Sequence, residues 1–130
     1  VLSLPGLPAT LAAYPDPLGP ASTLELRARA YLHSNCSQCH RPGSTAPSNM
    51  DLRFQTALSA MNACGAAPQR GDLGIAGAKL IAPGHPEQSI LIQRMKALDA
   101  VRMPPVGSLV VDQTGVDVLS AWITGLTACN

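Results

Sequence analysis

Residues 35–43 read NCSQCHRPG and place two thiols and an imidazole, those of Cys36, Cys39 and His40, within five positions. Two cysteines separated by two residues and followed directly by histidine are compatible with three kinds of chemistry. These are a dithiol redox pair, part of a metal site, and covalent attachment of a c-type haem. The rest of the chain has to decide among them.

The size and composition of the chain indicate one compact domain with an unusual core. A chain of 130 residues is long enough for one domain and too short for two ordinary ones. Its aromatic residues make up only 3% of the sequence, namely Tyr14, Tyr31, Phe54 and Trp122. Large aromatic side chains usually dominate buried area, so their scarcity predicts that something bulky fills the core besides the polypeptide.

The charge pattern argues against several classes of partner. Nine basic residues face eight acidic ones, and no run of lysine or arginine is present that would follow a phosphate backbone. We therefore expect no nucleic-acid partner. No apolar stretch approaches the roughly twenty residues that a membrane span needs. The sequence begins at Val1 without an initiator methionine or a signal peptide, so we expect a soluble fragment or a processed mature chain.

The N-terminal segment differs in composition from the rest. Residues 1–21 hold five of the twelve prolines and almost no charge. Such a composition favours extended, semi-rigid structure, so we interpret residues 1–21 as a Pro-rich linker or strap that a further domain once preceded. Residues 22–130 are then the folded domain.

The first predicted helix leads directly into the cysteine motif. It starts at Ser22, where the residues STLE form a capping box between Ser22 and Glu25. One face of this helix is apolar and runs to Cys36, through Leu24, Ala28, Tyr31 and Leu32.

Three further helices are predicted beyond the motif. The first spans about 51–62, the second opens at Pro86, and the last runs from a cap at Asp112 to about Leu126. No segment alternates convincingly with a period of two. The sequence therefore predicts an all-α fold of about four helices joined by loops rich in glycine and proline.

The surrounding pattern favours haem attachment over the two alternatives. A redox dithiol is expected at a strand-to-helix turn of a βαβ unit, and no such unit is predicted. A structural zinc site needs four ligands, and the sequence has no second pair of closely spaced cysteines or histidines. In the haem interpretation, Cys36 and Cys39 form thioethers with the porphyrin and His40 binds the iron from the same side. One covalent haem would also supply the missing bulk of the core.

A second axial ligand is expected on the other side of the iron. Met103 stands in the sequence VRMPPVG, where Pro104 and Pro105 prevent a helix and hold an extended, rigid loop. A side chain held in such a loop can point toward an iron without belonging to any helical face. Methionine opposite histidine is one of the known ligand pairs of haem.

Other methionines and histidines are weaker candidates for this ligand. Met61 and Met95 have the spacing of core residues on predicted helices, and Met50 lies too close to His40 to return from the opposite side of a macrocycle. His33 is expected at the end of the first helix. His85 remains the alternative ligand, since imidazole commonly binds iron.

The motifs CSQCH and RMPP, followed by the final helix GVDVLSAWITGL, resemble a class I cytochrome c domain over about residues 22–127. The stretches MDLR and IAPGHPEQSILIQRM are similar to the cytochrome domains appended to bacterial sugar and alcohol dehydrogenases, often quinoproteins. The resemblance implies thioethers at Cys36 and Cys39, a proximal ligand at His40 and a distal one at Met103.

Two details depart from many members of this class. Many members have a glycine where the first and last helices cross, and Ala28 stands at that position here. We therefore expect the two helices to cross at a slightly greater distance. Many members also orient the proximal imidazole through the carbonyl of a Gly-Pro pair. Here the corresponding candidate is Pro47, preceded by Ala46.

Four further residues are given roles by their chemistry. Arg53 and Arg102 either neutralise haem propionates or are ordinary exposed arginines. Cys64 and Cys129 are expected to form a disulfide, because haem attachment and disulfides both belong to an oxidising compartment. Two buried thiols, or a bond to an absent domain, are the alternatives, since the sequence alone does not set connectivity.

These features predict an electron carrier and not an enzyme, located in the periplasm or an equivalent extracytoplasmic space. It would accept electrons from a dehydrogenase, which could be a domain of the same polypeptide, and pass them to a cytochrome or oxidase. We expect a monomer that docks through an apolar patch around the haem edge. The rival functions are a haem enzyme or sensor, in which Met103 detaches to admit peroxide or a diatomic gas, and a thiol redox or zinc module.

Overall fold

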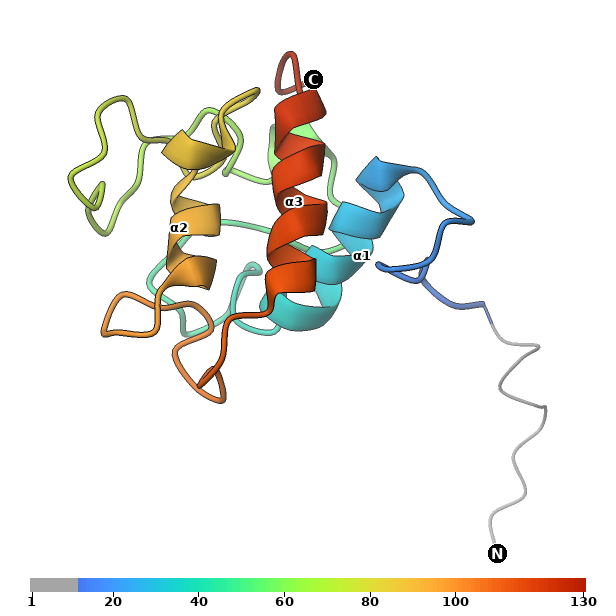
Figure 1. Cartoon of the computed structure of the whole chain (residues 1–130), viewed down its shortest axis with the longest axis horizontal. Helices are drawn as coiled ribbons and strands as arrows, with labels where there is room; N and C mark the ends of the chain where they lie inside the picture. Colours follow the sequence, from blue (N-terminus) through green and yellow to red (C-terminus); the bar gives the residue numbers. More distant parts are fainter. Residues whose placement is uncertain (1–11) are drawn as a thin grey trace, which may run out of the picture.

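The computed structural model describes residues 12–130, and the N-terminal part of the predicted extension, residues 1–11, lies outside them (Figure 1). The described chain has three α-helices and two short 3-10 helices: α1 (Leu24–Cys36), η2 (Leu58–Ala60), η3 (Pro86–Gln88), α2 (Ile90–Lys96) and α3 (Gln113–Gly125). Within residues 12–130 there is no β-strand, only two isolated β-bridges. The predicted all-α class is therefore confirmed, with three α-helices where about four were expected.

Helix α1 forms where it was predicted, but its cap is different. The N-cap is Thr23, whose hydroxyl accepts a hydrogen bond from the Leu26 N–H at 3.3 Å. The predicted capping box between Ser22 and Glu25 is thus wrong by one residue. Glu25 does not take part in the cap but pairs with Arg29 one turn further on, where their side chains approach to 3.5 Å.

The helix predicted over about 51–62 is replaced by an extended segment and the single turn η2. Its backbone makes distant hydrogen bonds instead of helical ones. The Asp51 N–H donates to the Met61 carbonyl at 2.9 Å, and the Leu52 N–H donates to the His40 carbonyl at 2.9 Å. These bonds override the helical spacing of the apolar residues in this segment.

The remaining two helical predictions are close to the structure. The segment that opens at Pro86 divides into η3 and α2 at Ser89, whose fully buried hydroxyl accepts from the Ala82 N–H at 2.9 Å. Helix α3 begins after Asp112, as predicted, and the Asp112 carboxylate accepts from the Gly115 N–H at 3.0 Å.

Helix α3 packs against both α1 and α2, and this contact forms the core (Figure 1). The Tyr31 hydroxyl on α1 donates to the Asp112 carboxylate at 2.7 Å, just before α3. A Cβ atom at Gly115 would overlap the Tyr31 ring, so only glycine permits this approach. Gly115 of α3 is therefore a small residue that this contact requires, and Ala28 of α1 is fully buried in the same core.

The C-terminus is held to the middle of the chain by a covalent bond. Cys64 and Cys129 form a disulfide across a separation of 65 residues, with 5.6 Å between their Cα atoms. The predicted bridge is confirmed. Among residues 12–130, no helix has the length and apolar character that a membrane span requires.

Candidate functional site

One cavity brings together the four residues that the sequence singled out. Its volume is about 390 Å³, and Cys36, Cys39, His40 and Met103 all line it. Most of the surrounding lining is apolar, with Leu52, Ile90 and Leu91 among its residues. Two parts of the chain supply the four: the attachment segment, residues 36–40, and the methionine loop, residues 97–111.

The attachment segment is a tight turn at the end of α1. Cys36 is the last residue of the helix, and its carbonyl accepts from the N–H groups of both Cys39 (3.2 Å) and His40 (2.9 Å). The His40 carbonyl in turn accepts from the Leu52 N–H. Two local bonds and one distant bond therefore fix the backbone that carries both thiols and the imidazole.

The two thiols do not have the character of a redox pair. Neither is in a disulfide. Burial, and then the neighbouring Cys39, raise the pKa of Cys36 to about 12. Reactive dithiols instead have a lowered pKa, commonly at a helix N-terminus, whereas Cys36 ends a helix, where the dipole disfavours an anion. This environment suits thiols that become neutral thioethers.

A zinc site was the other alternative to haem. In the described part of the chain, no group of three or more His, Cys, Asp or Glu residues is arranged to hold a metal ion.

His40 has the form that a metal ligand requires. Burial lowers the pKa of His40, which favours the neutral imidazole. Its Nδ1 atom is buried and has no hydrogen-bond partner. Ala46 and Pro47 line the same cavity, but neither hydrogen-bonds this nitrogen, so the orienting role predicted for Pro47 is not borne out in the structure.

Three methionines reach the cavity, more than the sequence predicted. Met103 lies in the methionine loop, is 36% exposed, and donates its N–H to the Arg94 carbonyl at 2.9 Å. Met50 and Met95 pack against the core, where Met95 was expected, and both also line the cavity. Met61 is fully buried in the core, as predicted.

The two remaining histidines do not line the cavity. His85 is exposed, and its Nδ1 lies 3.0 Å from the Glu87 carboxylate. The Nδ1 of His33 accepts from the Phe54 N–H at 3.2 Å. The structure therefore offers no support for His85 as the alternative axial ligand.

The arginines at the cavity are different from those predicted. Arg53 makes two hydrogen bonds to the Asp51 carboxylate, at 2.8 and 2.7 Å, and Arg102 donates to nearby loop carbonyls. Neither lines the cavity, whereas Arg70 and Arg94 do. For Arg94 a sequence signal existed, because Ile90, Leu91, Arg94 and Met95 share one face of a helix and all line the cavity.

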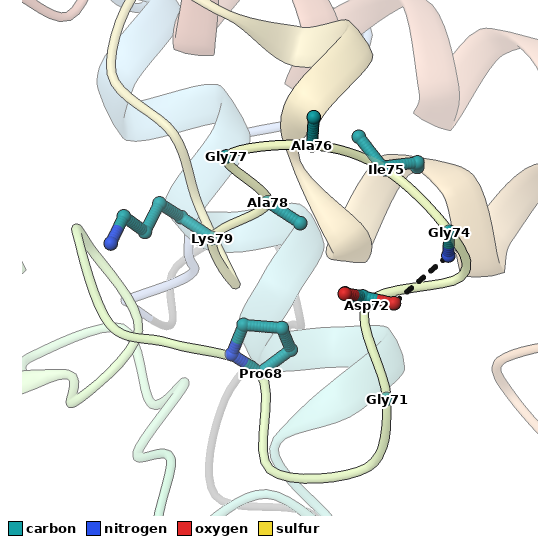
Figure 2. A pocket seen from close by; sticks show the side chains of 9 residues that line it. All are labelled: Pro68, Gly71, Asp72, Gly74, Ile75, Ala76, Gly77, Ala78 and Lys79. Carbon is teal, nitrogen blue, oxygen red and sulfur yellow. Dashed lines mark hydrogen bonds between the residues drawn. The ribbon is translucent and has the colours of Figure 1, made fainter.

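A second hollow, of about 620 Å³, lies within the loop of residues 68–79 (Figure 2). Its only charged side chains are Asp72 and Lys79. The Asp72 carboxylate accepts from the Gly74 N–H at 2.9 Å, and Figure 2 shows Lys79 extending away from it. Because the polar groups do not converge, this hollow has no recognisable chemistry.

Comparison with known families identifies the family of this chain. The sequence model of the Planctomycete cytochrome C family matches residues 36–107, more than half of the chain. This range begins at Cys36 and includes Met103. The chain belongs to this family. No curated protein and no solved structure matches it.

Membership of the Planctomycete cytochrome C family makes this a cytochrome c-type domain for haem-dependent electron transfer, and it implies a covalently bound haem c. The residues present fit that group. The cavity is largely apolar, it has two free thiols and a half-buried imidazole from one turn, and it has thioether side chains from elsewhere in the chain. Arg70 and Arg94 are the cationic side chains available there for carboxylates.

Proposed function

We propose that this chain is a mono-haem electron carrier, in which Cys36 and Cys39 form the thioethers and His40 and Met103 are the axial ligands. The observation that carries this proposal is the shared cavity. Two segments whose key residues, His40 and Met103, stand 63 positions apart contribute to one apolar space.

The haem, when bound, supplies an iron that gains and loses one electron. The residues of the chain determine the reduction potential of that iron and whether a substrate can reach it. A neutral imidazole and a thioether together leave no position open for substrate, and methionine favours a higher reduction potential than more basic ligands do. The apolar lining excludes water, which strengthens the influence of each nearby charge.

The electron donor in this proposal is a dehydrogenase, either a separate protein or a neighbouring domain of the same polypeptide, and the acceptor is a cytochrome or oxidase. The formal net charge is only +1, so long-range steering is weak. The most exposed large apolar side chains of the methionine loop are those of Val106 (78%), Leu109 (85%) and Val110 (80%). These suit a transient apolar contact between redox proteins.

The proposed location is the periplasm or an equivalent oxidising compartment. The disulfide between Cys64 and Cys129 supports it, because such bonds persist where the surroundings are oxidising. The same compartment suits thioether attachment at Cys36 and Cys39.

The test is an optical spectrum of the holoprotein, oxidised by air and then reduced with dithionite. A sharp α-band on reduction and a weak far-red band in the ferric state, from sulfur-to-iron charge transfer, are expected. Haem colour that stays with the protein through acid-acetone extraction would establish the covalent bonds. Haem bands without the far-red band would contradict ligation by methionine.

A haem enzyme or sensor is the second candidate, and the 36% exposure of Met103 is the observation that favours it. A ligand on an exposed loop can detach and admit a small molecule. Rapid binding of carbon monoxide to the ferrous wild-type protein would support this candidate. Absence of binding would support the electron carrier.

A further inference from the structure

The side chain and backbone of Arg94 join three parts of the chain at the edge of the cavity. Its guanidinium donates to the Val101 carbonyl at 3.0 Å and to the Arg70 carbonyl at 2.7 Å. Its own carbonyl accepts from the Met103 N–H at 2.9 Å. Arg94 therefore holds the methionine loop at two points, Met103 and Val101.

The methionine loop has little else to hold it. Among the described residues, every hydrogen bond that links residues 98–110 to another segment involves Arg94. The remaining bonds lie within the loop, such as those of Arg102 with Asp99 and Pro105. The apolar side chains at its tip are exposed and add little packing. Apart from the backbone bond of Met103 to the Arg94 carbonyl, the loop's attachment by hydrogen bonds thus depends on the guanidinium of this one arginine.

We propose that Arg94 is the positioning residue for the Met103 thioether. This inference rests on the proposed function, in which Met103 binds the iron. A planar guanidinium with donors pointing in different directions can bridge the Val101 and Arg70 carbonyls at once. Lysine keeps the positive charge but offers a single point of contact, so it cannot hold the same geometry. Loss of the bridge frees the loop, and Met103 spends more time away from the iron.

The test compares R94K with R27K in the holoprotein. Arg27 is a matched control, because its Nε donates to one carbonyl, that of Pro17, and it does not line the cavity. In R94K we expect a weaker far-red band and carbon monoxide binding to the ferrous form that is about tenfold faster or more, the scale of losing a hydrogen bond from a charged donor. The α-band should remain, since the thioethers and His40 are untouched. R27K should match the wild type.

A double-mutant cycle separates positioning from a general structural role. If Arg94 acts through Met103, the substitution R94K should not change carbon monoxide binding further in a protein that already carries M103A. An equal acceleration in both backgrounds would overturn the proposal, as would an R94K protein with an undiminished far-red band and wild-type binding.

Two other outcomes are also informative. If neither R94K nor a second variant, R94Q, accumulates as holoprotein, the arginine is needed for the whole fold and a local positioning role is wrong. If instead the wild-type protein lacks the far-red band, the ligand assignment of Met103 has failed first. The wild-type spectrum therefore distinguishes failure of the proposed function from failure of this inference.

Discussion

The attachment segment and the methionine loop serve the same cavity but are held in different ways. In the attachment segment, the Cys36 carbonyl accepts two local hydrogen bonds and the His40 carbonyl accepts a third from Leu52. The methionine loop is largely exposed, and the hydrogen bonds that join residues 98–110 to the rest of the described chain all involve Arg94. The difference teaches that one side of the proposed haem site is fixed by backbone hydrogen bonds alone, whereas the other has one backbone bond, from Met103 to the Arg94 carbonyl, and depends for the rest on the Arg94 side chain.

Removing the thiols should have the largest effect. In the double variant C36A/C39A we expect complete loss of covalently bound haem, because no other free cysteine is present in the chain. The measurement is haem retention after acid-acetone extraction. The variant C64A/C129A is the control, and it should retain its haem. Covalent haem in C36A/C39A would show that the fixed side of the cavity has been misidentified.

Breaking the other side should open the site without releasing the cofactor. In M103A we expect the α-band to persist, the far-red band to vanish, and carbon monoxide to bind rapidly to the ferrous protein. Met50 and Met95 also line the cavity, so M50A and M95A are the matched controls and should keep the far-red band. If M50A or M95A loses that band while M103A keeps it, the wrong methionine has been assigned.

The disulfide between Cys64 and Cys129 lies outside both the attachment segment and the methionine loop, so its removal tests whether a stabilising bond elsewhere also affects the cavity. In C64A/C129A we expect the free energy of unfolding to fall by about 4 kcal/mol, the loop-closure value for a separation of 65 residues. Urea denaturation measures this loss. The ferric far-red band should be unchanged, and a lost band would mean that the bridge also positions Met103.

The smallest effect is expected from a carboxylate beside the attachment segment. Hydrogen bonds from Arg53 lower the pKa of Asp51 to about 2, from a usual value of 3.8. A carboxyl with a lowered pKa stabilises the fold above its unfolded-state pKa, and that stabilisation is lost as the pH falls through the folded value. Between about pH 4 and pH 2, D51N should therefore lose less stability than the wild type does.

Urea denaturation of D51N at several pH values tests this prediction. The control is D117N, a change on the exposed side of α3. A pH dependence in D51N as steep as that of the wild type would assign the acid sensitivity to other carboxylates. The ferric spectrum near neutral pH should be the same in all three proteins.

Local signals in the sequence predicted the parts of the structure that depend on neighbouring residues. The cysteine motif, the Asp112 cap and the proline loop at Met103 each act within a few positions, and the structure forms the turn, the helix and the loop that they indicate. The disulfide was predictable because only two cysteines remained once the motif was set aside.

The predictions from sequence fail where contacts with residues distant in the chain determine the local structure. The helical spacing over 51–62 is real, but Asp51 and Leu52 find backbone acceptors at Met61 and His40, and the helix does not form. The arginines show the same limit. Arg53 has a carboxylate two residues away, whereas Arg94 reaches the cavity because α2 places it there. For Arg94, the helical face that it shares with Ile90, Leu91 and Met95 was a signal in the sequence, whereas Arg70 reaches the cavity from a loop, where no such periodicity exists.

The contact between Tyr31 and Asp112 also bears on the order in which the parts of this chain fold. That hydrogen bond joins residues 81 positions apart, and Gly115 allows it by leaving room for the ring. Closing so long a loop is slow compared with forming a helix or a turn. The residues for covalent attachment are complete by position 40, whereas α3 begins only at Gln113. We therefore expect α1 and the cysteine turn at its end to form before α3 packs against α1.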